Sequence, residues 1–411
     1  MSADPKAART RPASPLLEDL LAELTWPVLL RAGRLATRPA RVGIALMFLL
    51  ALGLLLSLAD RLDGSTDKSN VLLVHGERTV TSARSFAIGV WAGDYSRAGT
   101  HLADAFINHP WSCVSAAPLA TILFVPLLLL LAAITGGAIS RSAATELAWS
   151  RPIPWPTALA LGLSRWRSLL GALLLPLLLT WLGAVSLSIA GWVVFSTGAA
   201  SVLGGLLWLL FLLVGLALTL LMIGVALGHW MLVPSVTCEG ADAIDATQHT
   251  LALVFARPFR LVGYLLVLLV QGLVLAAVVG VVVAGAIAIA RSSAAAWLDA
   301  DHAAILGGAD LAAPADAPRP SGRLASTGRG LVRTSTTVFT LAGVAVLVSY
   351  AWCAATALFL AMRRVVDGQD VGELWSPGSP GGTLPATSPP PTVAARSSGE
   401  AIIDNGPADD R

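Results

Sequence analysis

Long apolar runs without Asp, Glu, Lys or Arg dominate the pattern of this chain. They lie between Arg41 and Asp60, Asp104 and Arg141, Arg167 and Glu239, Arg260 and Arg291, and Arg333 and Arg363. A transmembrane helix needs about 20 apolar residues to cross a hydrocarbon core of about 30 Å. Four of the runs therefore each hold one span. The run from Arg167 to Glu239 is long enough for two, with a break at residues 195–201.

The pattern predicts an all-α fold, a polytopic transmembrane helical bundle with six spans. Helices are favoured over barrel strands because the runs are continuously apolar and do not alternate. The predicted spans are about 42–59, 113–138, 169–194, 202–228, 262–290 and 337–362. The chain then divides into an N-terminal amphipathic segment, 1–41, a membrane domain, 42–362, and a disordered tail, 363–411.

Arginines in front of the first span predict its orientation. After Ser14-Pro15, the stretch LLEDLLAELTW has the apolar periodicity of a helix lying on the membrane. Arg31, Arg34, Arg38 and Arg41 follow at helical spacing. Because positive residues favour the cytoplasmic side, we expect the N-terminus to be inside. With six spans, the C-terminus is then inside as well.

Composition supports a membrane protein and excludes several functions. The chain is 55% apolar and only 13% charged, whereas soluble domains are about a quarter charged. A net charge of +2 gives no reason to expect a nucleic-acid partner. The three cysteines show no C-x-x-C spacing for a metal or redox site. We expect no cofactor and no metal.

The two longer segments on the outer side are expected to be small. In the first, NVLLVHGERTVT has the pattern of a short β-hairpin, and the segment as a whole is expected to form an interfacial cap. The second, 292–335, is rich in Ala, Asp, Pro, Gly and Ser, which predicts a mobile segment.

The stretch GGAISRSAATELAWSRPIPW follows the second span. A phosphate-binding loop requires a preceding strand and GxGxxG or GK[ST] spacing, and neither is present. We interpret the glycines as a membrane exit, with Arg141 and Glu146 in the cytoplasmic loop that follows. The prolines and tryptophans beyond them predict an amphipathic segment leading into the third span.

A second cytoplasmic loop carries the other candidate residues. Glu239, Asp242, Asp245 and His249 advance by three or four residues, which predicts one helix face. Carboxylates and an imidazole on one face can bind a divalent metal. Acidic residues at a helix start, with Arg257 and Arg260 at its end, equally complement the helix dipole, and we favour this second interpretation. The two loops are expected to pair across the cytoplasmic side.

The span interiors contain no Asp, Glu, Lys or Arg, which argues against proton-coupled transport. Gln271 is a polar candidate inside the fifth span, either on a solute path or in a hydrogen bond between helices. Small residues repeat every four positions at Ala276, Gly280, Ala284 and Ala288, and again at Gly224 and Gly228. Both patterns predict close helix packing, within the bundle or between subunits.

Two motifs carry a resemblance to known sequences. GGAISRSAATELA and CEGADAIDATQHTLALVFARPFRLVGY resemble the GGAI-x-R-x-AA and EG-x-x-A-x-DA motifs of a group of bacterial multi-pass membrane proteins. The layout is more loosely similar to the membrane domain attached to some glycerophosphodiester phosphodiesterases, without their phosphodiesterase domain or metal-binding acids. The resemblance implies a location in the bacterial cytoplasmic membrane and supplies no reaction.

Two functions lead from the sequence, and a membrane-embedded enzyme, which would need the acidic helix face to hold a metal, ranks third. The first is a non-catalytic membrane protein that organises lipids, a membrane-protein partner or a second copy through its cytoplasmic loops. The alternative is a transporter or channel for a neutral or lipid-like solute. No GxSxG or HExxH motif favours an enzyme.

Overall fold

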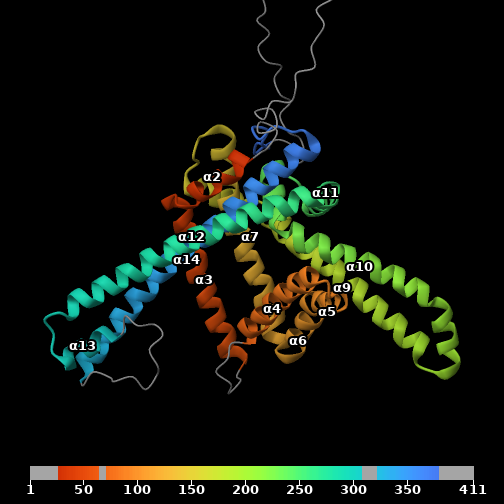
Figure 1. Ribbon diagram of the computed structural model, residues 1–411, viewed down its shortest axis with the longest axis horizontal. Coiled ribbons are helices and arrows are strands. Elements are labelled where there is room, and N and C mark those ends of the chain that lie inside the picture. The colour runs from red at the N-terminus through yellow and green to blue at the C-terminus, as the bar shows by residue number, and fades with distance from the viewer. Residues whose placement is uncertain (1–25, 64–70, 308–321, 379–411) are drawn as a thin grey trace, which may run out of the picture.

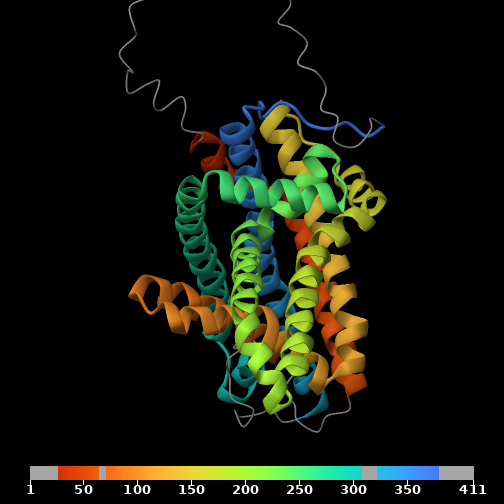
Figure 2. The ribbon, with the colours of Figure 1, turned by 90° about the vertical axis from the view of Figure 1, so that its right-hand side faces the viewer.

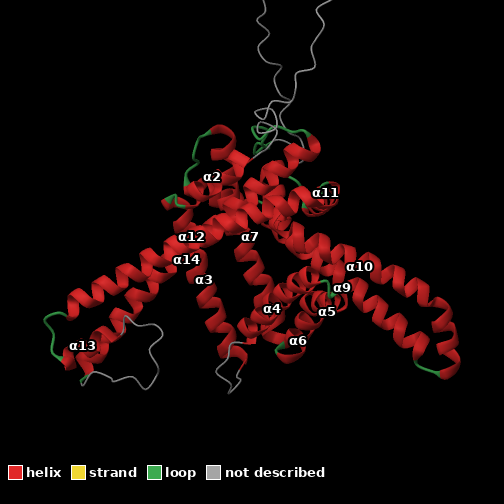
Figure 3. Ribbon diagram, in the orientation of Figure 1, coloured by secondary structure: helices red, strands yellow, loops and turns green. Residues whose placement is uncertain are grey.

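The computed structural model describes residues 26–63, 71–307 and 322–378. Within them every regular element is a helix (Figure 3). Six helices are long and apolar enough to cross a membrane. They are α3 (Pro39–Asp63), α7 (Pro118–Trp149), α9 (Trp166–Phe195), α10 (Gly198–Glu239), α12 (Pro258–Ala295) and α14 (Arg323–Asp367). The predicted all-α multi-pass architecture is confirmed.

Shorter helices gather at the two ends of the bundle. At one end lie α2 (Trp26–Ala36), α8 (Trp155–Ser164) and α11 (Ala243–Ala256). Together with residues 368–378 they form what we call the head, at the top of Figure 1. Between α3 and α7 lie α4 (Val71–Ala92), α5 (Tyr95–Ala103), η1 (Asp104–Asn108) and α6 (His109–Ala116). The last short helix, α13 (Ala300–Leu306), follows α12.

The hydrophobic core lies in the head half of the molecule. It joins apolar residues of α2, α3, α7, α11, α12 and α14. Helix α14 is the central helix of this core. Its side chains from Cys353 to Arg363 are buried without interruption. In its most apolar stretch 67% of residues are buried, against 6% in α10 and in α12. Most of the packed interior is therefore at one end, and a smaller cluster of Ala59, Ala117, Ala120 and Phe124 lies away from the head.

Two helical hairpins leave this core in opposite directions. Helices α9 and α10 form one arm, and α12 and α14 form the other (Figures 1 and 2). Close contacts within each arm come from glycines, such as Gly183 against Leu218 and Gly343 against Val283. The outer surfaces of both arms remain apolar and uncovered by the chain, as a lipid-facing surface requires.

Three segments outside the predicted spans differ from expectation. NVLLVHGERTVT lies mainly in α4, because Val71–Ala92 pack as a helix against α5 and α6. The segment 292–335 is helical at both of its described ends, since α12 continues to Ala295 and α14 begins at Arg323. Residues 363–378 of the predicted tail pack into the head. The amphipathic helix expected within residues 16–24 lies outside the described residues.

The two small-residue patterns have different surroundings. A methyl group on Gly224 would lie 2.7 Å from Leu251 Cδ2, and one on Gly228 would lie 2.9 Å from Thr250 Cγ2. These glycines let α11 pack closely across α10, which confirms close packing within the bundle. By contrast, nothing lies within 4 Å of the corresponding position on Gly280, and Ala284 is exposed.

Candidate functional site

A buried ion-pair cluster joins α2, α3 and α7 in the head. Both carboxylate oxygens of Glu146 accept hydrogen bonds of 2.7 Å, one from Arg38 and one from Arg41. The Arg41 guanidinium also donates to the Leu35 carbonyl at 2.7 Å and to Ser142 Oγ at 3.1 Å. Arg41 is only 1% exposed. One guanidinium thus ties the last turn of α2 to α7.

A second ion-pair cluster joins α10, α11 and α14. His249 Nδ1 lies 2.9 Å from Glu239 Oε2, and Nε2 lies 3.0 Å from Asp367 Oδ2. With a carboxylate at each ring nitrogen, the imidazolium form is favoured. The hydrogen bond to Glu239 raises the pKa of His249 to about 9, against the opposing effect of burial. His249 is therefore a cationic cross-link at neutral pH.

The predicted single helix face is wrong for Glu239. Helix α10 ends at Glu239 because Gly240 adopts a left-handed backbone with φ +66°. Asp242 then caps α11, and its Oδ1 accepts from the backbone N–H groups of Ile244 and Asp245, each at 2.9 Å. The helix-end interpretation is confirmed for Asp242.

Arg141 occupies a different position from the one predicted. Helix α7 continues past the predicted membrane exit, so Arg141 and Glu146 lie on a helix and not in a loop. Arg141 is 4% exposed, and its Nη1 donates to the Thr237 carbonyl of α10 at 3.0 Å. The two predicted loops do meet, but Arg141 contacts a backbone carbonyl there and not one of the acidic side chains of the second loop.

The glycine pair before Arg141 is a helix-packing point. A methyl group on Gly136 would lie 2.6 Å from the Trp352 ring, and one on Gly137 would lie 2.8 Å from Leu169. The absence of both side chains lets α14 and α9 approach α7 on two sides. This contact, and not a phosphate, explains the two glycines.

Residues 368–378, assigned to the disordered tail in the sequence analysis, form a strap across the head. Arg363 is fully buried, and its Nη2 donates to the carbonyls of Asp370 and Glu373 at 3.0 and 2.7 Å. Its Nη1 lies 3.8 Å from Glu239 Oε1, beyond hydrogen-bond distance. Arg363 thus connects the strap to the second ion-pair cluster.

Trp375 packs the strap against the other elements of the head. Its backbone N–H donates to the Cys238 carbonyl at 2.7 Å. Its ring lies against Gly240, and the Arg165 guanidinium lies 4.3 Å from the ring centroid. From the other side, Trp149 Nε1 donates to the Gly372 carbonyl at 3.0 Å. A signal was present in the sequence: Leu374 and Trp375 stand alone as large apolar residues in a polar segment.

The remaining candidates lie at the edge of the head or inside the second arm. Asp245, Arg257 and Arg260 are exposed. Gln271 donates from Nε2 to the Leu30 carbonyl at 2.8 Å, and its Oε1 lies 3.2 Å from the Tyr350 hydroxyl, which donates also to the Leu268 carbonyl. Its amide therefore fastens α2 to α12 and α14.

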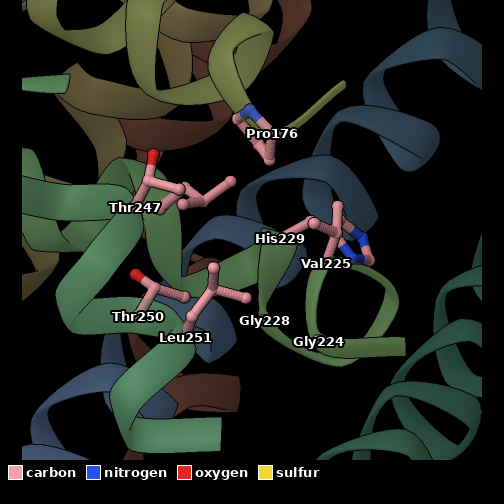
Figure 4. A pocket seen from close by; sticks show the side chains of 9 residues that line it. Pro176, Gly224, Val225, Gly228, His229, Thr247, Thr250 and Leu251 are labelled. Carbon is pink, nitrogen blue, oxygen red and sulfur yellow. The ribbon is translucent and has the colours of Figure 1, made fainter. Parts of the chain in front are cut away.

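A small cavity lies where α9, α10 and α11 meet (Figure 4). Its volume is about 10 Å³, enough for about one water molecule. The lining includes Pro176, Gly228, His229 and Leu251. Across the described ranges, no three His, Cys, Asp or Glu side chains come together in a way that holds a metal ion.

No protein-family model, curated protein or solved structure matches this chain.

Proposed function

We propose that this protein is a non-catalytic scaffold of the bacterial cytoplasmic membrane that holds lipids or a membrane-protein partner at its head. This proposal rests on the contacts that the buried arginine side chains make. Arg41, Arg141 and Arg363 each connect two or more elements, and none of the three lines the cavity between α9, α10 and α11. Removing one partner of a buried guanidinium is strongly destabilising, so these side chains have a structural role.

The rest of the molecule fits a scaffold as well. The head is fixed by ion pairs, while the two arms spread apolar surfaces into the surroundings (Figure 1). In a bilayer these surfaces face lipid or another membrane protein. A head held by ion pairs, with two spread arms, suits a protein that organises its neighbours.

Exposed arginines support a cytoplasmic location for the head. Arg31 and Arg34 of α2, Arg167 of α9, and Arg257 and Arg260 near the start of α12 are all exposed. By the positive-inside tendency this end faces the cytoplasm. Arginines beside an anionic leaflet attract phospholipid headgroups and acidic partner segments.

Phe259 offers a direct test of the docking surface. Its side chain is 92% exposed and lies between the exposed Arg257 and Arg260. We would replace Phe259 with a photo-cross-linking phenylalanine analogue in native membranes, and use Phe195, at the end of α9, as the matched control. We expect a discrete adduct at Phe259, absent at Phe195, which weakens in an R257A/R260A variant.

Two results would count against the scaffold. One is the same diffuse lipid labelling at both phenylalanines, unaffected by R257A/R260A. The other is flux of a neutral or lipid-like solute in proteoliposomes that Q271L abolishes while the fold persists. The latter would establish the transporter alternative.

A further inference from the structure

Helices α4 and α5 form a hairpin that projects sideways from the bundle (Figure 2). The turn is built by Gly93, with φ +74°, and by Asp94, whose side chain accepts from the Arg97 N–H at 3.1 Å. The helices come close near the tip, since a methyl group on Gly89 would lie 3.2 Å from Ala98 Cβ. The tip is therefore a well-defined structure.

The tip carries large apolar side chains that stay exposed among the described residues. Trp91 is 94% exposed, Tyr95 73%, Ile88 56% and Val90 45%. Trp and Tyr combine an apolar ring with a polar group and concentrate where a membrane meets water. The composition of the tip matches that environment.

The base of the hairpin is attached to a membrane span. Trp181, midway along α9, donates from Nε1 to the Phe106 carbonyl at 3.1 Å. The same ring lies 6.0 Å from the Trp111 ring of α6. Because the base packs on a span and the hairpin projects sideways (Figure 2), the tip reaches out beside the bundle and not past the ends of the spans.

Exposed tryptophans along the arms indicate where the membrane boundaries lie. On α10, Trp208 and Trp230 are 53% and 40% exposed and about 33 Å apart at 1.5 Å per residue. On α9, Trp166 and Trp192 are 41% and 75% exposed and about 39 Å apart on the same rise. These separations suit two aromatic belts on tilted helices around a hydrocarbon core of about 30 Å.

We infer that the tip of the α4–α5 hairpin is an anchor in the lipid interface on the side opposite the head. Its partner is the headgroup and upper acyl region of the bilayer, contacted by Val90, Trp91 and Tyr95. Arg84 lies about two turns before Trp91 on the same helix face and is exposed, so its guanidinium can reach phosphates. This anchor is independent of the scaffold role proposed for the head.

The test uses the accessibility of an engineered thiol. Cys113, Cys238 and Cys353 are buried, so a fluorescent maleimide will label V90C selectively. Two controls bracket the result: L209C, at a residue that is 68% exposed on α10, and S376C, at an exposed residue of the strap. Each labelled protein is reconstituted in vesicles of phosphatidylethanolamine and phosphatidylglycerol, with and without brominated lipid, and titrated with iodide.

We expect V90C to be quenched several-fold more by brominated lipid than S376C, and less by iodide. The W91S/Y95S double substitution in the V90C background should reverse this order if the aromatic rings hold the tip in the interface. Iodide quenching of V90C equal to that of S376C would overturn the inference. So would protection of V90C that depends on protein density and not on brominated lipid, because a second copy would then be the partner.

Discussion

Glu239 and His249 bring three helices together through one imidazole. Glu239 is the last residue of α10, and its Oε2 lies 2.9 Å from Nδ1 of His249 on α11. The other ring nitrogen faces Asp367, the last residue of α14, at 3.0 Å. The chain thus joins the ends of two membrane helices through a third that crosses them.

The charge of His249 should make stability depend on pH. Its pKa rises from 6.5 in the unfolded chain to about 9 in the folded protein. The stabilisation is therefore complete below pH 6.5, declines above it and is lost as the pH passes through about 9. We expect the melting temperature of the detergent-solubilised protein to fall across this window.

The H249Q variant isolates this effect. It should melt lower than the wild type at neutral pH, and the difference should shrink toward alkaline pH. H302Q is the matched control because His302 is exposed and lies outside the head. A constant difference between wild type and H249Q across the window would disprove the ionic role.

In the Glu146 cluster, we expect the ion pair with Arg41 to matter much more for stability than the ion pair with Arg38. E146Q leaves the buried Arg41 without a counter-ion, which costs about 3–5 kcal/mol for a broken buried pair. R38A should cost no more than about 1 kcal/mol, because the Arg38 side chain is 53% exposed. Chemical denaturation in mixed micelles measures both differences.

A double substitution tests the same cluster by removing both charges of the buried pair. R41M/E146L removes both charges and leaves no buried ion without a partner. We expect this double variant to be more stable than E146Q alone, because apolar replacement of an entire pair is often neutral or stabilising. A double variant less stable than E146Q would indicate that Arg41 acts mainly through the Leu35 carbonyl.

The sequence predicted the spans well because each charge-free run has only one way to satisfy its backbone in lipid. It failed where helices extend beyond that boundary. Arg141 looked like the first residue outside the membrane, yet α7 continues to Trp149. Where a helix continues beyond the membrane boundary, a charged residue on it can be buried against another helix. The hydropathy pattern does not contain information about that contact.

The sequence identified several residues of the candidate site correctly, but it did not identify their interaction partners. Glu146 and Glu239 both belong to ion-pair clusters, but their partners come from distant parts of the chain. The spacing of Glu239, Asp242 and His249 predicts one helix, and Gly240 interrupts it. Only the fold shows that α11 turns back and brings His249 to Glu239.

The strap makes a prediction about local stability. W375A removes a ring that is 4% exposed and packed against Gly240 and Arg165. A buried Trp to Ala change typically costs about 3–5 kcal/mol. We expect faster hydrogen exchange in residues 368–378 with little change in α9 or α12. S376A, at the exposed neighbour, is the control, and slow exchange of the strap in W375A would show that other contacts hold it.

Gln271 makes the last prediction, which separates packing from transport. Its amide donates to the Leu30 carbonyl and lies beside the Tyr350 hydroxyl, so Q271L should loosen α2 from the second arm. Hydrogen bonds between membrane helices contribute about 0.6 kcal/mol on average and up to about 1.7, so the fold should persist. Hydrogen exchange should therefore increase in α2 alone. Y350F, which keeps the bond from Gln271 to Leu30, should cause a smaller increase. Equal effects of the two variants would mean that Tyr350, rather than the α2 carbonyl, is the important partner of Gln271.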